Sequence, residues 1–316
     1  MPERKAILSA SLALMSLPLL AAGAVFGSES PLGTRISAPA VTDPINPNGP
    51  NSEPVKLEPG APPRSPFVIG QPKPVPPFPI LLNRLVQEYV DDYLSQPASW
   101  EASVERSRPF FLEMTQALRA EGVPDDMLYL SFAESDFSER GKGPWQFNKE
   151  TAVRYGLRVD RWVDERRDPV LSTKAAAQYL SDLHDEAGRD WRVAVVGWNG
   201  GDLAIGRFWL LRGENFNRFM DLLPGQTRAL MGRFMAFAFM AHNSTRYGLV
   251  HLDYAPPAYH EVPVRGGTML SKVAGSYHTT VAKLHHLNPA LLSDRIPPYA
   301  HSYQVRVPLL RTAFAR

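Results

Sequence analysis

Glu134 is the acidic residue whose position in the sequence best suits proton transfer. Pro124 fits the first turn of a helix, and Met127, Leu130 and Glu134 follow at spacings that share one helical face. A carboxyl group beside apolar side chains loses hydration, which raises its pKa toward the range that a general acid needs near neutral pH. A surface glutamate near a helix end shows the same spacing more often, and it is the alternative.

Other kinds of reactive centre find little support in the composition. The chain has 316 residues, no cysteine and a net charge of +2, so it offers neither a thiol nucleophile nor a basic surface for nucleic acid. Its eight histidines show no metal-ligand spacing, and the adjacent His285 and His286 cannot share one helical face. We therefore expect no metal, no cofactor and no nucleic-acid partner.

The N-terminal 79 residues predict an export signal and a linker. In residues 1–27, Arg4 and Lys5 precede an apolar stretch that ends in a small-residue cleavage pattern, as in a signal peptide. An uncleaved signal anchor, which would tether the chain to a membrane, is the alternative. Residues 28–79 hold 15 of the 30 prolines, so we expect a disordered linker, either a spacer toward a distant polymer or a tolerant tail.

Residues 80–252 predict an all-helical domain, because no run shows sustained strand alternation. Asp168 fits an N-cap before Pro169, and Gly188 fits the stop of the same helix. The last long segment is apolar on nearly all sides, so we expect it at the centre of the domain. The predicted helices lie at 81–94, 107–122, 124–134, 169–188, 190–202 and 223–248, and a further helix is expected to open after residues 145–147.

Residues 258–310 predict a small second module with both strands and helices. Strand-like patterns at 260–264 and 303–307 flank two short helical patterns at 269–276 and 280–287. The expected order is therefore β-α-α-β.

The order of short motifs resembles that of the lytic murein transglycosylases, and the membrane-bound transglycosylase D branch fits best. The resemblance runs from about Leu81 to Leu249 and implies a lysozyme-like helical fold. The C-terminal β-α-α-β pattern resembles a degenerate LysM repeat, which could bind glycan or serve only as a packing module. The motifs in order are Glu134-Ser135, Trp145-Gln146-Phe147, Tyr155-Gly156-Leu157, Asp164-Glu165-Arg166, Ser172-Thr173 and Trp198-Asn199-Gly200.

The resemblance implies an exported enzyme of the periplasm that acts on peptidoglycan with one carboxyl group. Glu134 would protonate the bridging oxygen of the MurNAc-GlcNAc β-1,4 bond, then take the proton of the sugar's own C6 hydroxyl, which leaves 1,6-anhydro-MurNAc. Ordinary glycosidases need two carboxyl groups, and Asp136, two residues on, points to another helical face and reads as a turn or cap residue.

The resemblance also implies which residues meet the sugar. Ser135 would hydrogen-bond substrate, fix the following loop or cap the helix, and Gln146 offers a donor and an acceptor to an acetamido or hydroxyl group. Phe147 would line the site by resemblance, but we favour a core position for both Phe147 and Trp145, because large aromatic side chains are usually buried. Trp198 stands where the family has Tyr, and Asn199 would contact the N-acetyl group.

Two departures from the family pattern favour an alternative function. Only ten residues, Ser135 to Pro144, separate Glu134 from the Trp-Gln-Phe motif, and Leu230 stands where the family has a tyrosine. The alternative is a weakened or inactive protein of the same fold that binds peptidoglycan as a scaffold. A hydrolase that uses water is a third reading, but it would require a second placed carboxylate.

Overall fold

The computed structural model describes residues 77–138, 141–201, 204–206, 215–252 and 256–309. The predicted export signal and all but the last three residues of the predicted linker lie outside the described residues. Among the helices that are described, none has the length and apolar character that crossing a membrane requires.

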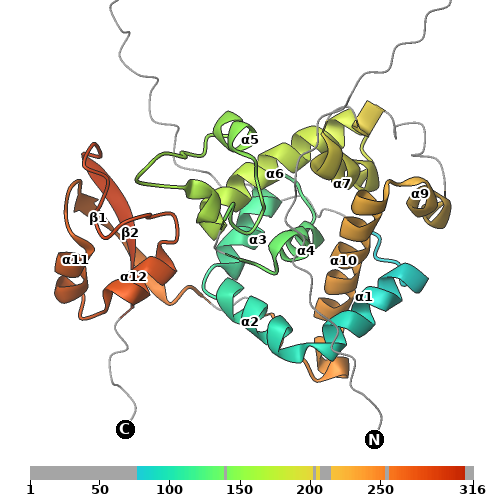
Figure 1. Cartoon of the computed structure of the whole chain (residues 1–316), viewed down its shortest axis with the longest axis horizontal. Coiled ribbons are helices and arrows are strands. Elements are labelled where there is room, and N and C mark those ends of the chain that lie inside the picture. Colours follow the sequence, from blue (N-terminus) through green and yellow to red (C-terminus); the bar gives the residue numbers. More distant parts are fainter. Residues whose placement is uncertain (1–76, 139–140, 202–203, 207–214, 253–255, 310–316) are drawn as a thin grey trace, which may run out of the picture. The chain divides into compact units, whose positions relative to one another are not determined.

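The first part of the described chain is built from helices, as predicted (Figure 1). Two helices were missing from the prediction. One is α9, Phe216–Leu222. The other is α2, Pro97–Ser107, a mostly polar segment whose buried apolar residues are Trp100 and Val104. The helices are α1 Arg84–Ser95, α2 Pro97–Ser107, α3 Phe111–Ala120, α4 Leu128–Ser135, α5 Lys149–Arg154, α6 Pro169–Glu186, α7 Trp191–Gly200, α9 Phe216–Leu222 and α10 Gly225–His242.

Helix α10 lies at the centre and packs against α1, α4 and α7 (Figure 1). Its Phe237 stacks on Trp100 at 4.2 Å and on Phe132 of α4 at 4.3 Å between ring centroids. Gly232 lets α1 approach closely, because a Cβ there would come within 2.7 Å of the Tyr89 ring. The central place predicted for this apolar segment is confirmed, and α10 holds α4 in a fixed position.

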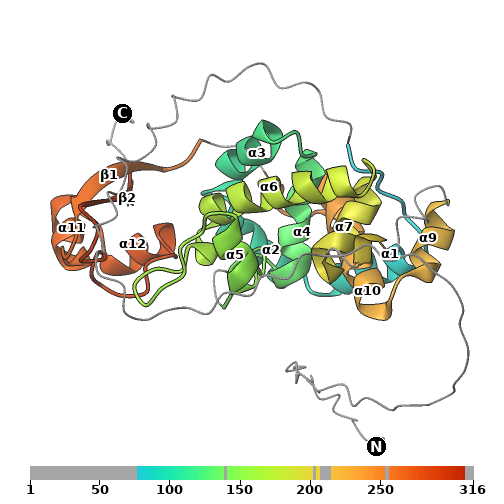
Figure 2. The same ribbon diagram turned by 90° about the horizontal axis from the view of Figure 1, so that it is seen from above.

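Local signals set the ends of α6, as predicted. The Asp168 carboxylate accepts hydrogen bonds from the backbone N–H groups of Val170 and Leu171, and Pro169 occupies the first turn. Gly188 follows the helix with a φ of +65°, a conformation that glycine adopts without strain. Helix α3 lies along α6 (Figure 2).

The C-terminal module has the predicted β-α-α-β order. It comprises β1 Tyr259–Arg265, α11 Leu270–Ser276, α12 Val281–Leu287 and β2 Ser302–Pro308. The strands pair antiparallel, with Tyr259 opposite Pro308 and Arg265 opposite Ser302. A separate small core fills the module, and it includes Val163 from the helical part of the chain.

Candidate active site

Glu134 lies in the last turn of α4, on a helix whose other side chains are almost all buried. A 3-10 turn, Asp125–Met127, leads into α4, and Asp136 ends it in the left-handed conformation with a φ of 50°. The Glu134 side chain is half-buried. A short helix packed on the core therefore fixes the carboxyl group at the edge of the domain.

The partner of Glu134 is an indole. Trp198, in the last turn of α7, donates its Nε1–H to Glu134 Oε1 at 2.9 Å. Burial raises the pKa of the Glu134 carboxyl group above its ordinary value, and the hydrogen bond from Trp198 and the charges of Arg233 and Lys142 partly oppose this shift. The raised pKa expected from the sequence is confirmed in direction, and burial is its main cause.

Four aromatic side chains form what we call the aromatic wall: Trp145, Phe147, Tyr179 and Trp198. The Trp198 ring meets Trp145 at 5.4 Å and Phe147 at 5.1 Å edge-to-face, and Tyr179 at 5.4 Å. Trp145 and Phe147 are 1% and 4% exposed, whereas Trp198 is half-buried. The core positions expected for Trp145 and Phe147 are confirmed, and Phe147 packs against Trp198. Direct contact of Phe147 with substrate stays a prediction.

Gln146 and Asn199 are the polar residues with accessible surface beside this wall. Gln146 is half-buried, has a φ of 52° and donates its side-chain N–H to the carbonyl of Gly143 at 2.7 Å. Asn199 is exposed, and its Oδ1 accepts the hydroxyl of Thr227 at 2.7 Å. Both amides are therefore held by a neighbour, which orients them for hydrogen bonding with a ligand.

The hydroxyl of Ser135 ties the end of α4 to the loop after it. Its Oγ lies 2.9 Å from the carbonyl of Pro144 and 3.1 Å from that of Ser131, and it accepts the N–H of Ser138 at 3.0 Å. Of the three roles considered for Ser135, these contacts support fixing the loop. The short loop is thus fastened directly beneath the aromatic wall.

The nearest other carboxyl group, Asp136, has the cap position that its spacing predicted. Its backbone carbonyl and that of Phe137 accept hydrogen bonds from the Arg106 guanidinium. Asp136 as a whole is exposed to solvent. Its carboxyl group is nevertheless partly desolvated, which raises the pKa of that group. Asp136 thus terminates α4.

Sequence reasoning missed Arg233, which α10 brings under α4. Its Nε donates to the carbonyl of Ala133 at 3.1 Å, and its charge favours the ionised form of Glu134. The signal that could have found it is an arginine in the middle of a helix, with apolar residues or glycine on both sides of it along the chain. Such a charge needs a partner, and here the partner is the end of the helix that carries Glu134.

The motifs expected to be structural are confirmed in that role. Arg166 pairs with Asp164 at 2.7 Å, which makes the predicted salt-linked turn. Thr173 Oγ1 donates to the carbonyl of Pro169 at 2.6 Å and accepts the indole N–H of Trp145 at 2.8 Å. These contacts join the start of α6 to the aromatic wall.

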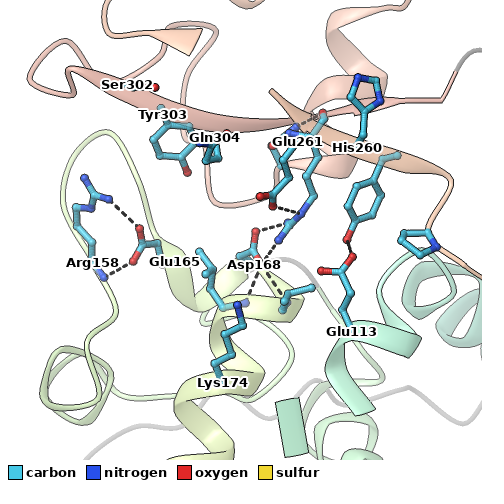
Figure 3. Close-up of a pocket in the computed structure, with 16 residues that line it drawn as sticks. Glu113, Arg158, Glu165, Asp168, Lys174, His260, Glu261, Ser302, Tyr303 and Gln304 are labelled. Atoms are coloured by element: carbon cyan, nitrogen blue, oxygen red, sulfur yellow. Dashed lines mark hydrogen bonds and ion pairs between the residues drawn. The ribbon is translucent and has the colours of Figure 1, made fainter. Parts of the chain in front are cut away.

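A cavity of about 510 Å³ lies away from Glu134, between the C-terminal module and α3 and α6 (Figure 3). Most of its charges pair with each other: Arg158 with Glu165 at 3.1 Å, and Arg306 with Asp168. Within the described part of the chain, no cluster of His, Asp and Glu side chains could hold a metal ion. The cavity is therefore lined by ion pairs at the interface between the C-terminal module and the helical part.

Comparisons with known proteins agree with the motifs. Residues 117–215 match the family model of the transglycosylase SLT domain. The chain is 25% identical over 236 residues to the membrane-bound lytic murein transglycosylase D of Escherichia coli strain K12, with 72% of this chain and 52% of the relative covered. The protein of the same description from Escherichia coli O6:H1 matches to the same extent.

A putative tributyltin chloride resistance protein of Alteromonas sp. strain M-1 is 27% identical over 116 residues, which cover 35% of this chain and 55% of that protein. The chain spans about half the length of the curated relatives it matches.

Proposed function

We propose that this chain, which carries a transglycosylase SLT domain and is similar to membrane-bound lytic murein transglycosylase D, cleaves the MurNAc-GlcNAc β-1,4 bond of peptidoglycan. The observation that carries the proposal is the setting of Glu134. Its carboxyl group is half-buried, its pKa is raised by burial, and the donor that it meets is the neutral indole of Trp198. A carboxyl group in such a setting keeps its proton nearer to neutral pH, as a general acid must.

The reaction uses Glu134 twice. In the first step the Glu134 carboxyl group gives its proton to the bridging oxygen, and the C1–O bond breaks with its electron pair going to that oxygen. In the second step the C6 hydroxyl of the same sugar attacks C1, and its proton passes to the Glu134 carboxylate. Because the nucleophile is already part of the substrate, it needs no activation of a separate water molecule. The products are 1,6-anhydro-MurNAc and a free GlcNAc end.

The residues around Glu134 stabilise its carboxylate form and bind the sugar. Trp198 keeps its N–H on the carboxylate formed after the first step and offers its exposed ring surface to a sugar face. Asn199 and Gln146 offer amide groups to the acetamido and hydroxyl groups of the glycan. Arg233 and Lys142 stabilise the carboxylate electrostatically, which limits how far burial can raise its pKa.

The remaining parts of the chain suit work in the cell wall. Residues 1–27 would direct export to the periplasm, either as a cleaved signal peptide or as a membrane tether, and residues 28–79 would serve as the linker. The helical domain would occupy residues 80–252 and the LysM-like module residues 258–310. The partner is the peptidoglycan glycan strand, and no cofactor is required by the two proton transfers.

The test is digestion of purified peptidoglycan followed by mass analysis of the soluble products. The proposal predicts anhydro-muropeptides, each lighter by one water than the corresponding reducing muropeptide. Reducing ends alone would replace the proposal with a hydrolase.

A second candidate, a peptidoglycan-binding protein without turnover, is favoured by Leu230, which is buried where the family has a tyrosine. Cosedimentation with insoluble peptidoglycan without soluble products would support it. The indole N–H of Trp198 argues against it, because it provides Glu134 with a hydrogen-bond donor in place of a tyrosine hydroxyl.

A further inference from the structure

One segment of the helical part, Arg158–Asp168, which we call the bridging segment, is shared between the two parts of the fold. Toward the module, Val163 is fully buried in the module's core. The backbone of the segment pairs with the module as well: Asp164 N–H donates to the carbonyl of Ala290 at 2.9 Å, and Leu292 N–H donates to that of Trp162 at 3.0 Å. The bridging segment is therefore a structural part of the module.

A buried ion pair closes this junction. The Arg306 guanidinium on β2 forms two hydrogen bonds to the Asp168 carboxylate, and both side chains are about 5% exposed. Arg306 also lies over the Phe110 and Tyr259 rings at 5.6 Å and 5.4 Å. Figure 3 shows Asp168 at the point where α6 begins, facing the strands of the module. The arginine thus binds the residue that caps α6.

On its other side the bridging segment holds the loop beside Glu134. Arg166 donates to the carbonyl of Phe147 at 3.1 Å, and Arg167 donates to that of Gly141 at 3.3 Å. Gly143 lies so close that an added Cβ would come within 1.9 Å of the Arg166 carbonyl oxygen. The loop 141–147 is therefore packed directly on the segment that the module clamps.

The loop in turn sets the aromatic wall. Trp145 hydrogen-bonds Thr173 in the first turns of α6, and Trp145 and Phe147 both support the ring of Trp198. Trp198 is the residue that donates to Glu134. Arg306 is thus connected to Glu134 through the bridging segment by hydrogen bonds, an ion pair and ring contacts, and the side chains that make them are buried or half-buried.

We propose that the C-terminal module is a positioning element of the active site, and that Arg306 is the positioning residue through which it acts. This inference rests on the proposed function, because the site it positions is the one around Glu134. An independent sugar-binding module would need no shared core and no buried ion pair with the cap of α6. Here the module clamps the bridging segment, and the segment fixes the loop that carries Gln146 and supports Trp198.

The test is an Arg306→Met variant of the whole chain, which keeps the aliphatic stem but removes the guanidinium. The expected result is a fall in kcat of about tenfold with KM and cosedimentation with peptidoglycan unchanged, because a displaced wall affects the chemical step. Arg306→Lys, which retains one charge for Asp168, should recover part of this loss. The matched control is Arg265→Met, since Arg265 lies exposed on β1 of the same module.

Hydrogen exchange gives a reading that does not depend on turnover. In Arg306→Met we expect faster exchange in residues 141–147 and no change in α1 and α10, which lie away from the junction. Should Arg306→Met not fold, Val163→Ala loosens the same junction from the bridging segment and predicts the same pattern. Unchanged exchange in 141–147 would overturn the inference, and so would lost cosedimentation with an unchanged kcat. If the wild type itself releases no products, the proposed function fails, and the exchange experiment alone decides the positioning role.

Discussion

Glu134 and Asp168 are two acidic side chains in low-hydration settings with opposite surroundings. Asp168 meets a guanidinium and two backbone N–H groups, whereas Glu134 meets a single indole N–H. A carboxylate with that many donors serves the stability of the fold, because its loss would leave a buried charge and two backbone N–H groups without their partner. A carboxyl group with one neutral donor keeps a proton that it can give away.

The comparison teaches that donor number and charge, more than burial, separate a structural acid from a reactive one. Both residues lie at helix ends, Asp168 before α6 and Glu134 in the last turn of α4. The N-terminus of a helix supplies N–H donors and favourable dipole, whereas its C-terminus supplies neither. The two ends therefore suit the two roles that we assign.

Breaking the reactive side of the comparison should have the largest effect. Glu134→Gln removes the transferable proton and should lower the release of soluble muropeptides by at least about 1,000-fold, as expected for loss of the general acid and base. The near-isosteric amide should leave the melting temperature almost unchanged. Asp136→Asn is the control and should keep activity within about threefold, since Asp136 serves as a cap. Equal losses in the two variants would contradict the assignment.

Breaking the structural side should cost stability instead. Asp168→Ala leaves the Arg306 charge buried without its partner and removes the cap of α6, so the free energy of unfolding should fall by about 3–5 kcal/mol in urea titrations. Asp190→Ala is the matched control, because Asp190 caps α7 and pairs with Arg192 at 2.5 Å in a more exposed place. There we expect a loss of about 1–2 kcal/mol. An equally large loss of stability in Asp190→Ala would show that burial of the Asp168–Arg306 pair does not increase the cost of breaking it.

Changing the donor on Glu134 sharpens the comparison. Trp198→Phe removes the hydrogen bond that lowers the pKa of Glu134, so this pKa should rise further. Because the first step needs the protonated acid, the alkaline limb of the kcat/KM profile should move to higher pH, with kcat reduced about tenfold. Trp191→Phe, which alters a ring stacked on His184, should leave the limb in place. A shift toward lower pH would contradict the role given to the indole.

We expect the smallest effect, on the pH dependence of stability, from the pair formed by a third carboxylate, Asp126. It is buried, accepts the backbone N–H of Phe78, and pairs with His242 at 2.7 Å. The hydrogen bond to Asp126 raises the pKa of His242 above its ordinary value of 6.5. The stabilisation is therefore complete below that value and is lost as pH rises through the raised pKa. His242→Gln should flatten this part of the stability profile in urea titrations, and an unchanged slope would contradict the pairing.

How far the sequence predicted the molecule depended on the range of each interaction. The cap at Asp168, the start at Pro169 and the stop at Gly188 are local, so residue type and spacing predicted them. The raised pKa of Glu134 also followed from apolar neighbours within its own helix. Helix α2 was missed because half of its buried face is serine: Ser103 and Ser107 lie beside Trp100 and Val104, so the sequence shows only two apolar positions there.

The contacts that distinguish the two carboxyl groups join residues far apart in the chain. Trp198 is 64 residues from Glu134, and Arg306 is 138 residues from Asp168. No periodicity within a segment reports which indole or guanidinium will fold onto it. Trp198 was predicted to lie in the site only from the family resemblance. Nothing in the sequence of β2 indicated that Arg306 would pair with the cap of α6.

The most direct test of the account is digestion of peptidoglycan in water enriched in oxygen-18, with product masses compared between wild type and Glu134→Gln. The account predicts muropeptides that end in 1,6-anhydro-MurNAc and carry no heavy oxygen at C1, because the sugar's own C6 hydroxyl closes the ring. Products of the wild-type chain with oxygen-18 at C1 would show that water is the nucleophile, and would contradict the role of Glu134 as the single acid and base.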